Sequence, residues 1–295
     1  MSKLEEIAAL VQVNGGVLDR IEGREVTVGL LERLLLTRYP KADAESWDRM
    51  GLLVGDPEAR VTGVAIALDA TVDAVRAAKA AGANVLLTHH PVFIEAPVSF
   101  HPLGTRGMGP GSVVFEAISS GVALMNFHTA LDVSVDGAHM LPRLLGLQLE
   151  GIVDVVCDDG RGYGQLCSLR ESDTPMDLRS LAARCLAIFG RPARVWGSMD
   201  VNLEKIVTCT GSAGDLPKRC IAAGYDCLVC GEVRYHAALE ASQAGLCIIE
   251  LGHDVSELPF CAVLAAVVAS LGYPEKSISI LDQGANWTVP EAIRK

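Results

Sequence analysis

The chain has 295 residues, a formal charge of −11 at pH 7 and a pI of about 5.1. Half of its residues are hydrophobic and its mean hydropathy is +0.31, so it can bury the core of one large domain or two ordinary ones. The acidic balance argues against nucleic acid or an anionic membrane as the main partner, because either would require a basic surface. A small-molecule substrate stays open.

The N-terminal residues and the cysteines bear on where the protein resides. No apolar run reaches the roughly 18 residues of a transmembrane helix, and Glu5 and Glu6 interrupt the first apolar stretch, unlike a signal peptide. The nine cysteines are odd in number and scattered through apolar segments, unlike the disulfide framework of a small secreted chain. We therefore expect a cytoplasmic protein whose cysteines are mostly small core residues.

Apolar patterning predicts alternating strands and helices along most of the chain. Residues 27–38 have the apolar spacing of a helix, and a loop with a short extended piece follows. The next elements are strands at 61–68, 84–88 and 122–127, with helices at 71–82 and 111–121 between them. Continuous apolar strands separated by helices are typical of a mostly parallel sheet that is covered on both faces.

The second half has a different beginning and then the same alternation. Shorter strands at 151–159, 162–170 and 193–198 accompany a helix at 177–190, and alternation resumes from residue 205 to residue 272. Residues 63–90 align without gaps to residues 205–232, which leaves open either a structural repeat or a shared pattern. Cys227 and Cys230 fall on a strand of this alignment, where core packing is favoured over a redox or zinc-binding pair.

Polar side chains follow three of the predicted strands. Ligands in open parallel α/β sheets bind beyond the carboxyl ends of the strands. Four histidines and two carboxylates occupy these positions: His89 and His90, then His128 and Asp132, then His253 and Glu257. Imidazole and carboxylate are ligands of borderline divalent metals, and this number of groups suffices for one ion or for two.

The arrangement of the two adjacent histidines favours two ions. Neighbouring side chains on an extended backbone point in opposite directions, so in a regular strand His89 and His90 are poorly placed to bind one ion. The arrangement is suitable at a strand end, or with one of the two histidines for each of two ions. The structural alternative is that each histidine is a hydrogen-bonded loop residue and that Glu257 is an acid at a helix start. Two weaker candidates are Glu232 and His236, four apart on one predicted helix face, and Asp69 has the position of an N-cap.

Six motifs occur in the order and spacing of a known family. They are SWDRMGLLVGDP, ALDAT, LLTHHPVFI, HTALD, CGEVRYH and GHDVSE. In these the chain resembles the YbgI/Nif-three-like family, also labelled dinuclear metal-centre hexameric proteins or homologues of type-two GTP cyclohydrolase I. The resemblance runs from about Thr27 to the C-terminus. Two departures are Asp254, where the family usually has an aromatic residue, and Val229-Cys230 in place of Ile-Thr.

The resemblance implies an α/β fold of two lobes, in the compact form that lacks an inserted domain. The expected boundaries are an N-terminal extension at 1–26, a metal-binding lobe at 27–137 plus 249–295, and a second lobe at 138–248. It also implies a toroidal homohexamer, a trimer of dimers, with two divalent ions per chain (Zn, Mn, Fe, Co or Ni). The implied metal ligands are His89, His90, Asp132, His253 and Glu257. His128 would lie beside the ions, with Glu232 and His236 near the cavity, as candidates for proton transfer.

Three functions are compatible with these residues. The leading hypothesis is a metal-dependent hydrolase that acts on a nucleotide-like small molecule, since two ions can generate a hydroxide nucleophile. The alternative is a non-catalytic metal-binding, metal-handling or scaffold protein, which would use the same ligands. A redox role for Cys227 and Cys230 is disfavoured, because thiol exchange requires access that a buried strand does not give.

Overall fold

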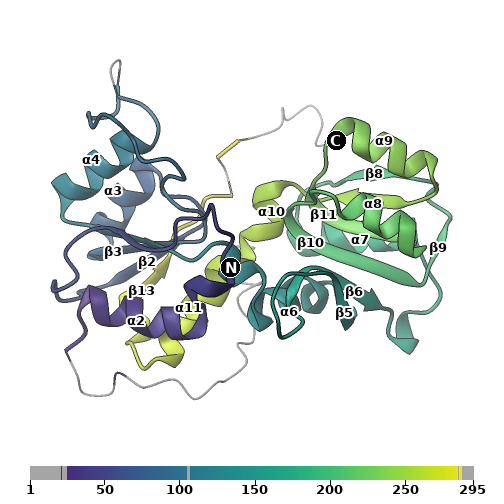
Figure 1. Ribbon diagram of the computed structural model, residues 1–295, viewed down its shortest axis with the longest axis horizontal. Helices are drawn as coiled ribbons and strands as arrows, with labels where there is room; N and C mark the ends of the chain where they lie inside the picture. The colour runs from purple at the N-terminus through teal and green to yellow at the C-terminus, as the bar shows by residue number, and fades with distance from the viewer. Residues whose placement is uncertain (1–20, 22–24, 105–106, 285, 288–295) are drawn as a thin grey trace. The chain divides into compact units, whose positions relative to one another are not determined.

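The computed structural model describes residues 21, 25–104, 107–284 and 286–287, so the predicted N-terminal extension lies almost wholly outside the described residues. The chain divides into two compact units, each built around one main sheet (Figure 1). We name them the five-stranded unit and the six-stranded unit. Of the described residues, the five-stranded unit takes those up to 37, those from 47 to 128 and those from 267 onward, and the six-stranded unit takes 38–46 and 129–266.

The sheet of the five-stranded unit has the strand order β1-β4-β3-β2-β13. Its strands are β1 (Gly51–Val54), β2 (Val64–Ala67), β3 (Val85–Thr88), β4 (Ala123–Asn126) and β13 (Ile278–Ile280). All residues of β2, β3 and β4 are buried, as expected of parallel strands in the middle of a sheet. Strand β1 pairs antiparallel with β4 at one edge, and β13 pairs parallel with β2 at the other.

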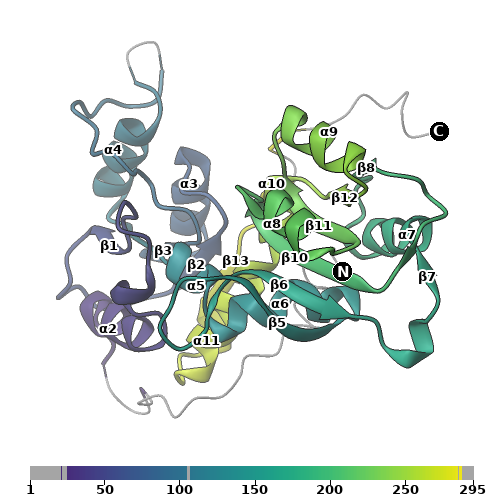
Figure 2. The ribbon, with the colours of Figure 1, turned by 45° about the vertical axis from the view of Figure 1, so that its right-hand side comes forward.

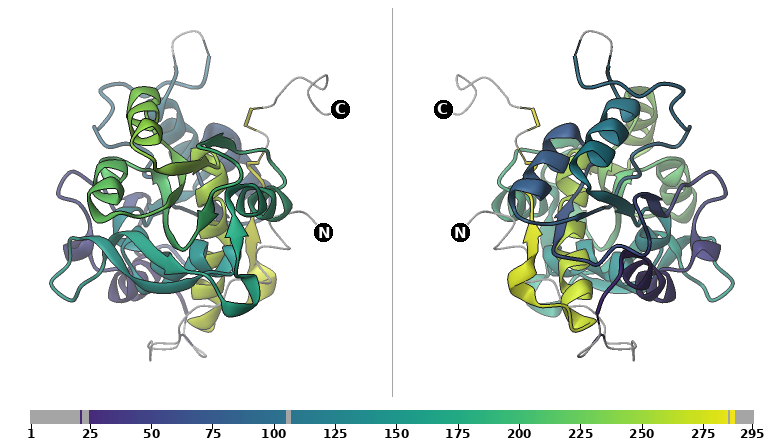
Figure 3. Two further views of the ribbon diagram at one scale, coloured as in Figure 1. Left: turned by 90° about the vertical axis from the view of Figure 1, so that its right-hand side faces the viewer. Right: turned by 90° about the vertical axis from the view of Figure 1, so that its left-hand side faces the viewer.

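Helices cover both faces of this sheet. Helices α3 (Val72–Ala80) and α4 (Pro110–Ser120) bury one set of alternate strand residues, which includes Ala65, Leu86 and Leu124. In the right-hand view of Figure 3 these two helices lie toward the viewer. The other set of alternate strand residues is also fully buried, and α2 (Val28–Arg38) lies on that side of the strands (Figure 1).

The sheet of the six-stranded unit is mixed, with the order β5-β6-β10-β11-β12-β8. Its strands are β5 (Gln148–Val155), β6 (Gly162–Ser168), β8 (Arg194–Trp196), β10 (Lys205–Ser212), β11 (Cys227–Glu232) and β12 (Cys247–Glu250). Parallel strands β10, β11 and β12 form the middle, and the outer strands join antiparallel. A separate two-stranded sheet pairs β7 (Met176–Asp177) with β9 (Asn202–Leu203).

Helices also flank the six-stranded sheet. Helices α8 (Leu216–Ala223) and α9 (Tyr235–Gln243) pack on one face (Figure 2). Helix α6 (Val135–Leu145) contacts β5, β6 and β10, and α7 (Leu178–Phe189) contacts α6. The architecture confirms the predicted α/β class. It adds that antiparallel strands extend the parallel centre of each sheet.

The cysteines confirm the prediction of core packing. All nine are free, and eight of them are buried. Cys227 and Cys230 lie three apart on β11, so their side chains point to opposite faces of the sheet. Cys230 belongs to the core under α8 and α9, whereas Cys227 neighbours Cys185 of α7. Burial raises the pKa of both thiols well above the usual range.

The alignment of residues 63–90 with 205–232 reflects a structural repeat. In the five-stranded unit Val64 pairs with Val85, and in the six-stranded unit their aligned residues, Ile206 and Cys227, form the corresponding pair. The next three pairs of each ladder match in the same way. The repeat extends to a third parallel strand, β4 or β12, with an antiparallel strand beyond it, β1 or β8.

Three segments group differently from the predicted lobes. Residues 38–46, 129–137 and 249–266 fall in the six-stranded unit, whereas the sequence groups them with the other lobe. For 249–266 the physical reason is that β12 (Cys247–Glu250) pairs with β11 and that α10 (His253–Glu257) packs on β10 and β11. For the other two segments, α5 (Thr129–Asp132) contacts both the short helix Lys41–Asp43 and α6, and α6 packs on β6.

The remaining helices include the most apolar stretch of the chain. Helix α11 (Pro259–Ser270) runs from the six-stranded unit into the five-stranded one. By length and composition the stretch His253–Ser270 is apolar enough to cross a membrane, yet 61% of it is buried within the protein. This burial is typical of a core helix in a soluble protein. The short helices are α5 (Thr129–Asp132), Lys41–Asp43, Glu171–Asp173 and Glu275–Ser277.

Candidate metal centre

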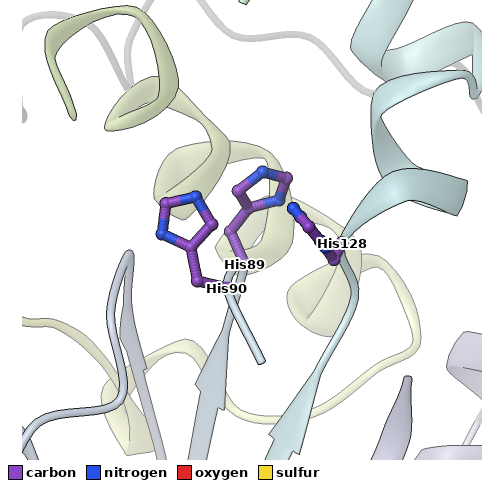
Figure 4. Close-up of side chains that lie close together, drawn as sticks. All are labelled: His89, His90 and His128. Carbon is purple, nitrogen blue, oxygen red and sulfur yellow. The ribbon is translucent and has the colours of Figure 1, made fainter. Parts of the chain in front are cut away.

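Three histidines of the five-stranded unit lie at the carboxyl ends of two neighbouring parallel strands. His89 and His90 directly follow β3, and His128 follows β4 after one intervening residue. Because β3 and β4 pair in parallel, their ends meet at one edge of the sheet and bring the three imidazoles together (Figure 4). The side chain of His89 is buried, and those of His90 and His128 are partly exposed.

The ring geometry of the two adjacent histidines is that of a strand end and not of a regular strand. The ring centroids of His89 and His90 are 4.9 Å apart, and each lies 5.2–5.5 Å from the centroid of His128. The three residues can each present a nitrogen within 4.8 Å of the others. Strand β3 ends at Thr88, whose hydroxyl donates to the carbonyl of His90. Because the extended conformation ends there, His89 and His90 do not point to opposite sides.

Each of the three imidazoles has an oxygen atom at its Nδ1 position. Nδ1 of His89 lies 3.1 Å from the carbonyl oxygen of Phe127, that of His90 lies 2.8 Å from Asp69, and that of His128 lies 3.1 Å from Asp48. A carbonyl or carboxylate oxygen can only accept, so Nδ1 carries the proton in each ring. Nε2 is then the ring nitrogen that carries the lone pair, which is the usual arrangement in histidine metal sites.

The two carboxylates of this cluster have roles that the sequence does not reveal. Asp69 does not cap α3, because Thr71 occupies the N-cap and its side chain accepts from the backbone N–H of Ala74. Asp69 instead accepts from His90. Asp48 comes from the SWDRMGLL segment, and its side chain has no exposed surface. Its pairing with His128 joins residues 80 positions apart, a contact for which the sequence carries no local signal.

The six-stranded unit holds a second group of metal-ligand residues at its own strand ends. His253 begins α10, its Nδ1 lies 3.1 Å from Glu232, and its Nε2 lies 3.1 Å from Glu257. A neutral imidazole can donate to only one of these carboxylates. An imidazolium could satisfy both, and so could a divalent cation in place of the Nε2 proton. Glu257 is buried, whereas Glu232 is more than half exposed.

Two glycines allow α10 to approach the strand ends closely. Gly211 has φ +56°, and a Cβ there would overlap the carboxylate of Glu257. A Cβ on Gly231 would overlap the carbonyl oxygen of Gly211 and the hydroxyl of Ser256. The same hydroxyl accepts from the backbone N–H of Gly211 at 2.9 Å. The backbone therefore comes within contact distance of Glu257, as only glycine permits.

The remaining sequence-predicted residues are placed as follows. Asp132 ends α5, and Thr210 Oγ1 donates to its carboxylate at 3.5 Å. Asp254 forms an ion pair with Arg191 at 2.8 Å, so its charge is compensated. His236 is exposed on α9, which begins at Tyr235. Glu232 belongs to β11, so the prediction that Glu232 and His236 share a helix face is wrong.

Glu257 lies at the junction of two helices. It is the last residue of the five-residue helix α10, and α11 begins two residues later at Pro259. Its place just before α11 agrees with the interpretation as an acid at a helix start, where negative charge is favoured. Its buried carboxylate also contacts His253.

The chemistry of these donor sets fits divalent cations. Neutral imidazoles held through Nδ1, with carboxylates close by, match the ligand preference of Zn, Mn, Fe, Co and Ni. Burial of the Glu257 carboxylate is favourable only with a compensating charge or hydrogen-bond donor. The fold and these clusters define an α/β protein with histidine and carboxylate groups suited to bind metal at its strand ends.

Comparison with known proteins identifies the family. The family described as Duf34/NIF3 (NGG1p interacting factor 3) matches residues 26–280, and the chain belongs to it. A "GTP cyclohydrolase 1 type 2 homolog" of Streptomyces coelicolor is 30% identical over 235 residues, which cover 77% of this chain and 80% of the relative. A protein of the same name from Clostridium perfringens is 29% identical over 217 residues, which cover 73% and 80%.

Solved structures share the fold. A hypothetical protein of Staphylococcus aureus superposes with a TM-score of 0.79 at 23% identity, over 90% of this chain and 99% of that one. A Bacillus cereus protein related to NIF3 gives a TM-score of 0.77 at 20% identity, over 88% and 98%. Both similarities concern the fold alone. The family match over residues 26–280 confirms the resemblance that the six sequence motifs indicate.

Proposed function

We propose that this protein is a divalent-metal-dependent hydrolase that acts on a nucleotide-like small molecule. The observation that carries the proposal is the common arrangement of three histidines, each with its Nδ1 beside an oxygen atom, which makes Nε2 the ring nitrogen with the lone pair that a metal binds. The proposed ligands of two ions per chain are His89, His90, Asp132, His253 and Glu257.

The side chains around these ligands have distinct proposed roles. Bound divalent ions would lower the pKa of a water molecule and so supply hydroxide at neutral pH. Asp69 and Asp48 would keep the imidazoles of His90 and His128 in the tautomer that binds metal. Glu232 orients His253 through its Nδ1 and is exposed enough to exchange a proton with a substrate. His128 lies beside His89 and His90, where it could complete a ligand set or transfer a proton.

The substrate class rests on the relatives. Their name, "GTP cyclohydrolase 1 type 2 homolog", points to attack by hydroxide on the purine ring carbon between two nitrogens, with release of formate. We extend this to the present chain as a proposal.

We also propose a toroidal homohexamer, which mass measurement of the native assembly can test. We further propose a cytoplasmic location, with which the free cysteines agree.

The test is the metal content per chain, followed by a search for activity. Protein purified without a chelating tag is analysed by elemental mass spectrometry as wild type, as His253→Ala and as the control His139→Ala. His139 lies on α6, its Nδ1 lies 2.8 Å from the carbonyl oxygen of Val135, and it belongs to none of the candidate ligand groups of the described residues. We expect close to two ions per chain in wild type and control, and at least one fewer in His253→Ala.

The outcomes separate the hypotheses. Release of formate or phosphate from nucleotides with Zn, Mn or Fe supplied would support the hydrolase. If metal is bound but no nucleotide is hydrolysed, and a weak chelator removes the ions readily, a metal-handling role replaces the hydrolase. If no metal is bound even after reconstitution, the strand-end histidines are structural and the proposal is wrong.

A further inference from the structure

Gln283 lies just beyond β13. Its side-chain amide forms hydrogen bonds with the backbone that directly follows β2. Its side chain is buried, with 8% of the residue exposed. Its Oε1 accepts from the backbone N–H groups of Leu68 and Asp69, at 2.9 Å each, and its Nε2 donates to the carbonyl oxygen of Asp69 at 3.0 Å. Three hydrogen bonds from one amide therefore fix two consecutive residues.

The side chain of Gln283 acts where the strand pairing has ended. The backbone N–H of Leu281 still bonds the carbonyl of Ile66, as in a parallel ladder. At Leu68 and Asp69 the side-chain amide of Gln283, and not a neighbouring strand, accepts the hydrogen bonds of the backbone N–H groups. Backbone groups at a buried strand end need such partners, because a buried donor or acceptor without one loses its hydrogen bonds to water and gains none in return.

The fixed backbone carries a group that contacts a candidate metal ligand. Oδ1 of Asp69 accepts from Nδ1 of His90 at 2.8 Å, and the carbonyl of Leu68 accepts from the backbone N–H of His90 at 3.0 Å. The two bonds join His90 to Asp69 and Leu68, and the backbone of both residues is hydrogen-bonded to Gln283. The hydrogen-bonded series Gln283–Asp69–His90 thus links the C-terminal segment to the histidine cluster.

We propose that Gln283 is a positioning residue for His90. By fixing the backbone of Leu68 and Asp69, it keeps the carboxylate against Nδ1 and so presents Nε2 as the ligand atom. The inference rests on the proposed function in taking His90 as a metal ligand. Partners that orient metal-binding histidines typically contribute about 10–100-fold to metal affinity. Because Gln283 acts through Asp69, we expect the lower end of that range.

Asn84 offers a matched control in the same sheet. Its Oδ1 accepts from the backbone N–H of Thr62 at 2.8 Å and from the hydroxyl of Thr62 at 3.1 Å, and its Nδ2 donates to the carbonyl of Arg60 at 2.8 Å. This amide therefore makes the same three-bond arrangement before β2 begins, at the end opposite the histidines. Asn84→Ala removes a comparable set of side-chain hydrogen bonds and leaves those of Asp69 in place.

The experiment compares wild type, Gln283→Ala, Gln283→Leu and Asn84→Ala, each first shown to be folded by its thermal unfolding transition. Gln283→Leu keeps most of the side-chain volume and loses only the hydrogen bonds. In metal-free protein, nitrogen-15 NMR of the imidazoles reports the His90 tautomer. Competition with a chromophoric chelator then gives the zinc affinity.

We expect both Gln283 variants to lose the single Nδ1–H tautomer of His90 and to bind zinc roughly tenfold more weakly. Asn84→Ala should keep the tautomer and stay within about twofold of wild type. Unchanged tautomer and affinity in both Gln283 variants would overturn the proposal, as would an equal loss in Asn84→Ala. If wild type takes up no zinc but the tautomer still depends on Gln283, the proposed function fails while the positioning of His90 stands.

Discussion

The Nδ1 atom of His128 lies 3.1 Å from the Oδ1 atom of Asp48, whose side chain has no exposed surface. The same carboxylate oxygen accepts from the backbone N–H of Arg49 at 2.7 Å, and the Trp47 ring meets the imidazole edge to face, with centroids 5.8 Å apart. Because burial of an unpaired carboxylate is unfavourable, Asp48 and His128 stabilise one another. The imidazole is therefore oriented by the fold itself.

This pairing predicts the effect of Asp48→Asn. The variant keeps the shape of the side chain but replaces a charged acceptor with a neutral amide that can also donate. We expect the Nδ1–H tautomer of His128 to be less favoured and zinc affinity, measured by chelator competition, to fall by about 10-fold or more if His128 is a ligand. If His128 only transfers protons, affinity should hold and the pH dependence of turnover should shift.

A surface aspartate supplies the control for that variant. Asp200 pairs with Arg179 at 3.1 Å, and its side chain is 83% exposed. Asp200→Asn removes the same charge without touching a histidine, so zinc affinity and turnover should match wild type. Equal behaviour of the two variants in both measurements would contradict a role for Asp48.

The sequence predicts the histidines of the site better than their partners. His89, His90 and His128 follow apolar runs that read as buried strands, and the order of parallel strands then places them at one edge. Asp69 precedes a helix and so has the pattern of an N-cap, but Thr71 takes that role two residues later. Asp48 lies in a loop that brings it into contact with His128, and no spacing of residues along the sequence predicts the course of that loop.

Two elements have no counterpart in the prediction. Helix α6 (Val135–Leu145) is amphipathic, with a capping Ser134 at its start and Gly146 at its end, but Pro142 within it is a residue that usually interrupts a helix. Strand β13 is three residues long, too short for an alternating pattern to be recognised. The repeat, by contrast, is visible in the sequence because both βαβ segments have the same lengths.

The buried thiols predict a loss of stability at alkaline pH. Burial raises the pKa of Cys167, Cys185, Cys209 and Cys220 to about 12, from an ordinary value of 9.0. In the unfolded chain these thiols ionise above pH 9, whereas in the folded protein they stay neutral. The stabilisation is therefore fully present below pH 9 and is lost as pH rises from 9 toward 12.

The magnitude of this effect can be measured by urea unfolding in reductant. Each thiol contributes about 1.4 kcal/mol per pH unit in that window, so four thiols together remove roughly 6 kcal/mol near pH 10. That loss is comparable to the whole stability of many domains. Cys220→Ala should reduce the slope by about one thiol's share. A free energy of unfolding that stays constant from pH 8 to 10.5 would contradict the prediction.

The same burial predicts the pattern of alkylation. Cys157 is the one cysteine that is not buried, and it lies in an exposed loop after β5. Iodoacetamide applied to native protein at pH 8 should modify Cys157 and leave Cys227 and Cys230 unmodified, as peptide mass spectrometry can show. Modification of both strand cysteines before unfolding would revive a redox role for them. In denaturant all nine should react, which controls for detection.

The contact of Gly211 with Glu257 predicts a result that separates backbone strain from damage to the site. Gly211→Ala and Gly224→Ala both place a side chain at positive φ, +56° and +68°, which costs about 1–2 kcal/mol. Around Gly224 there is open space, whereas at Gly211 the new methyl group overlaps the Glu257 carboxylate. Both variants should lose stability in urea unfolding, with the larger loss for Gly211→Ala.

Metal content distinguishes the two glycine variants more sharply than stability. In Gly211→Ala the carboxylate of Glu257 must move away from its place beside His253 Nε2, so we expect fewer ions per chain by elemental mass spectrometry. Gly224→Ala should retain the metal content of wild type, because its strain stays at the end of α8. Equal metal content in the two variants would mean that the close approach at Gly211 serves only to pack α10 on the sheet. An ion lost in Gly211→Ala alone would assign that approach to the metal centre.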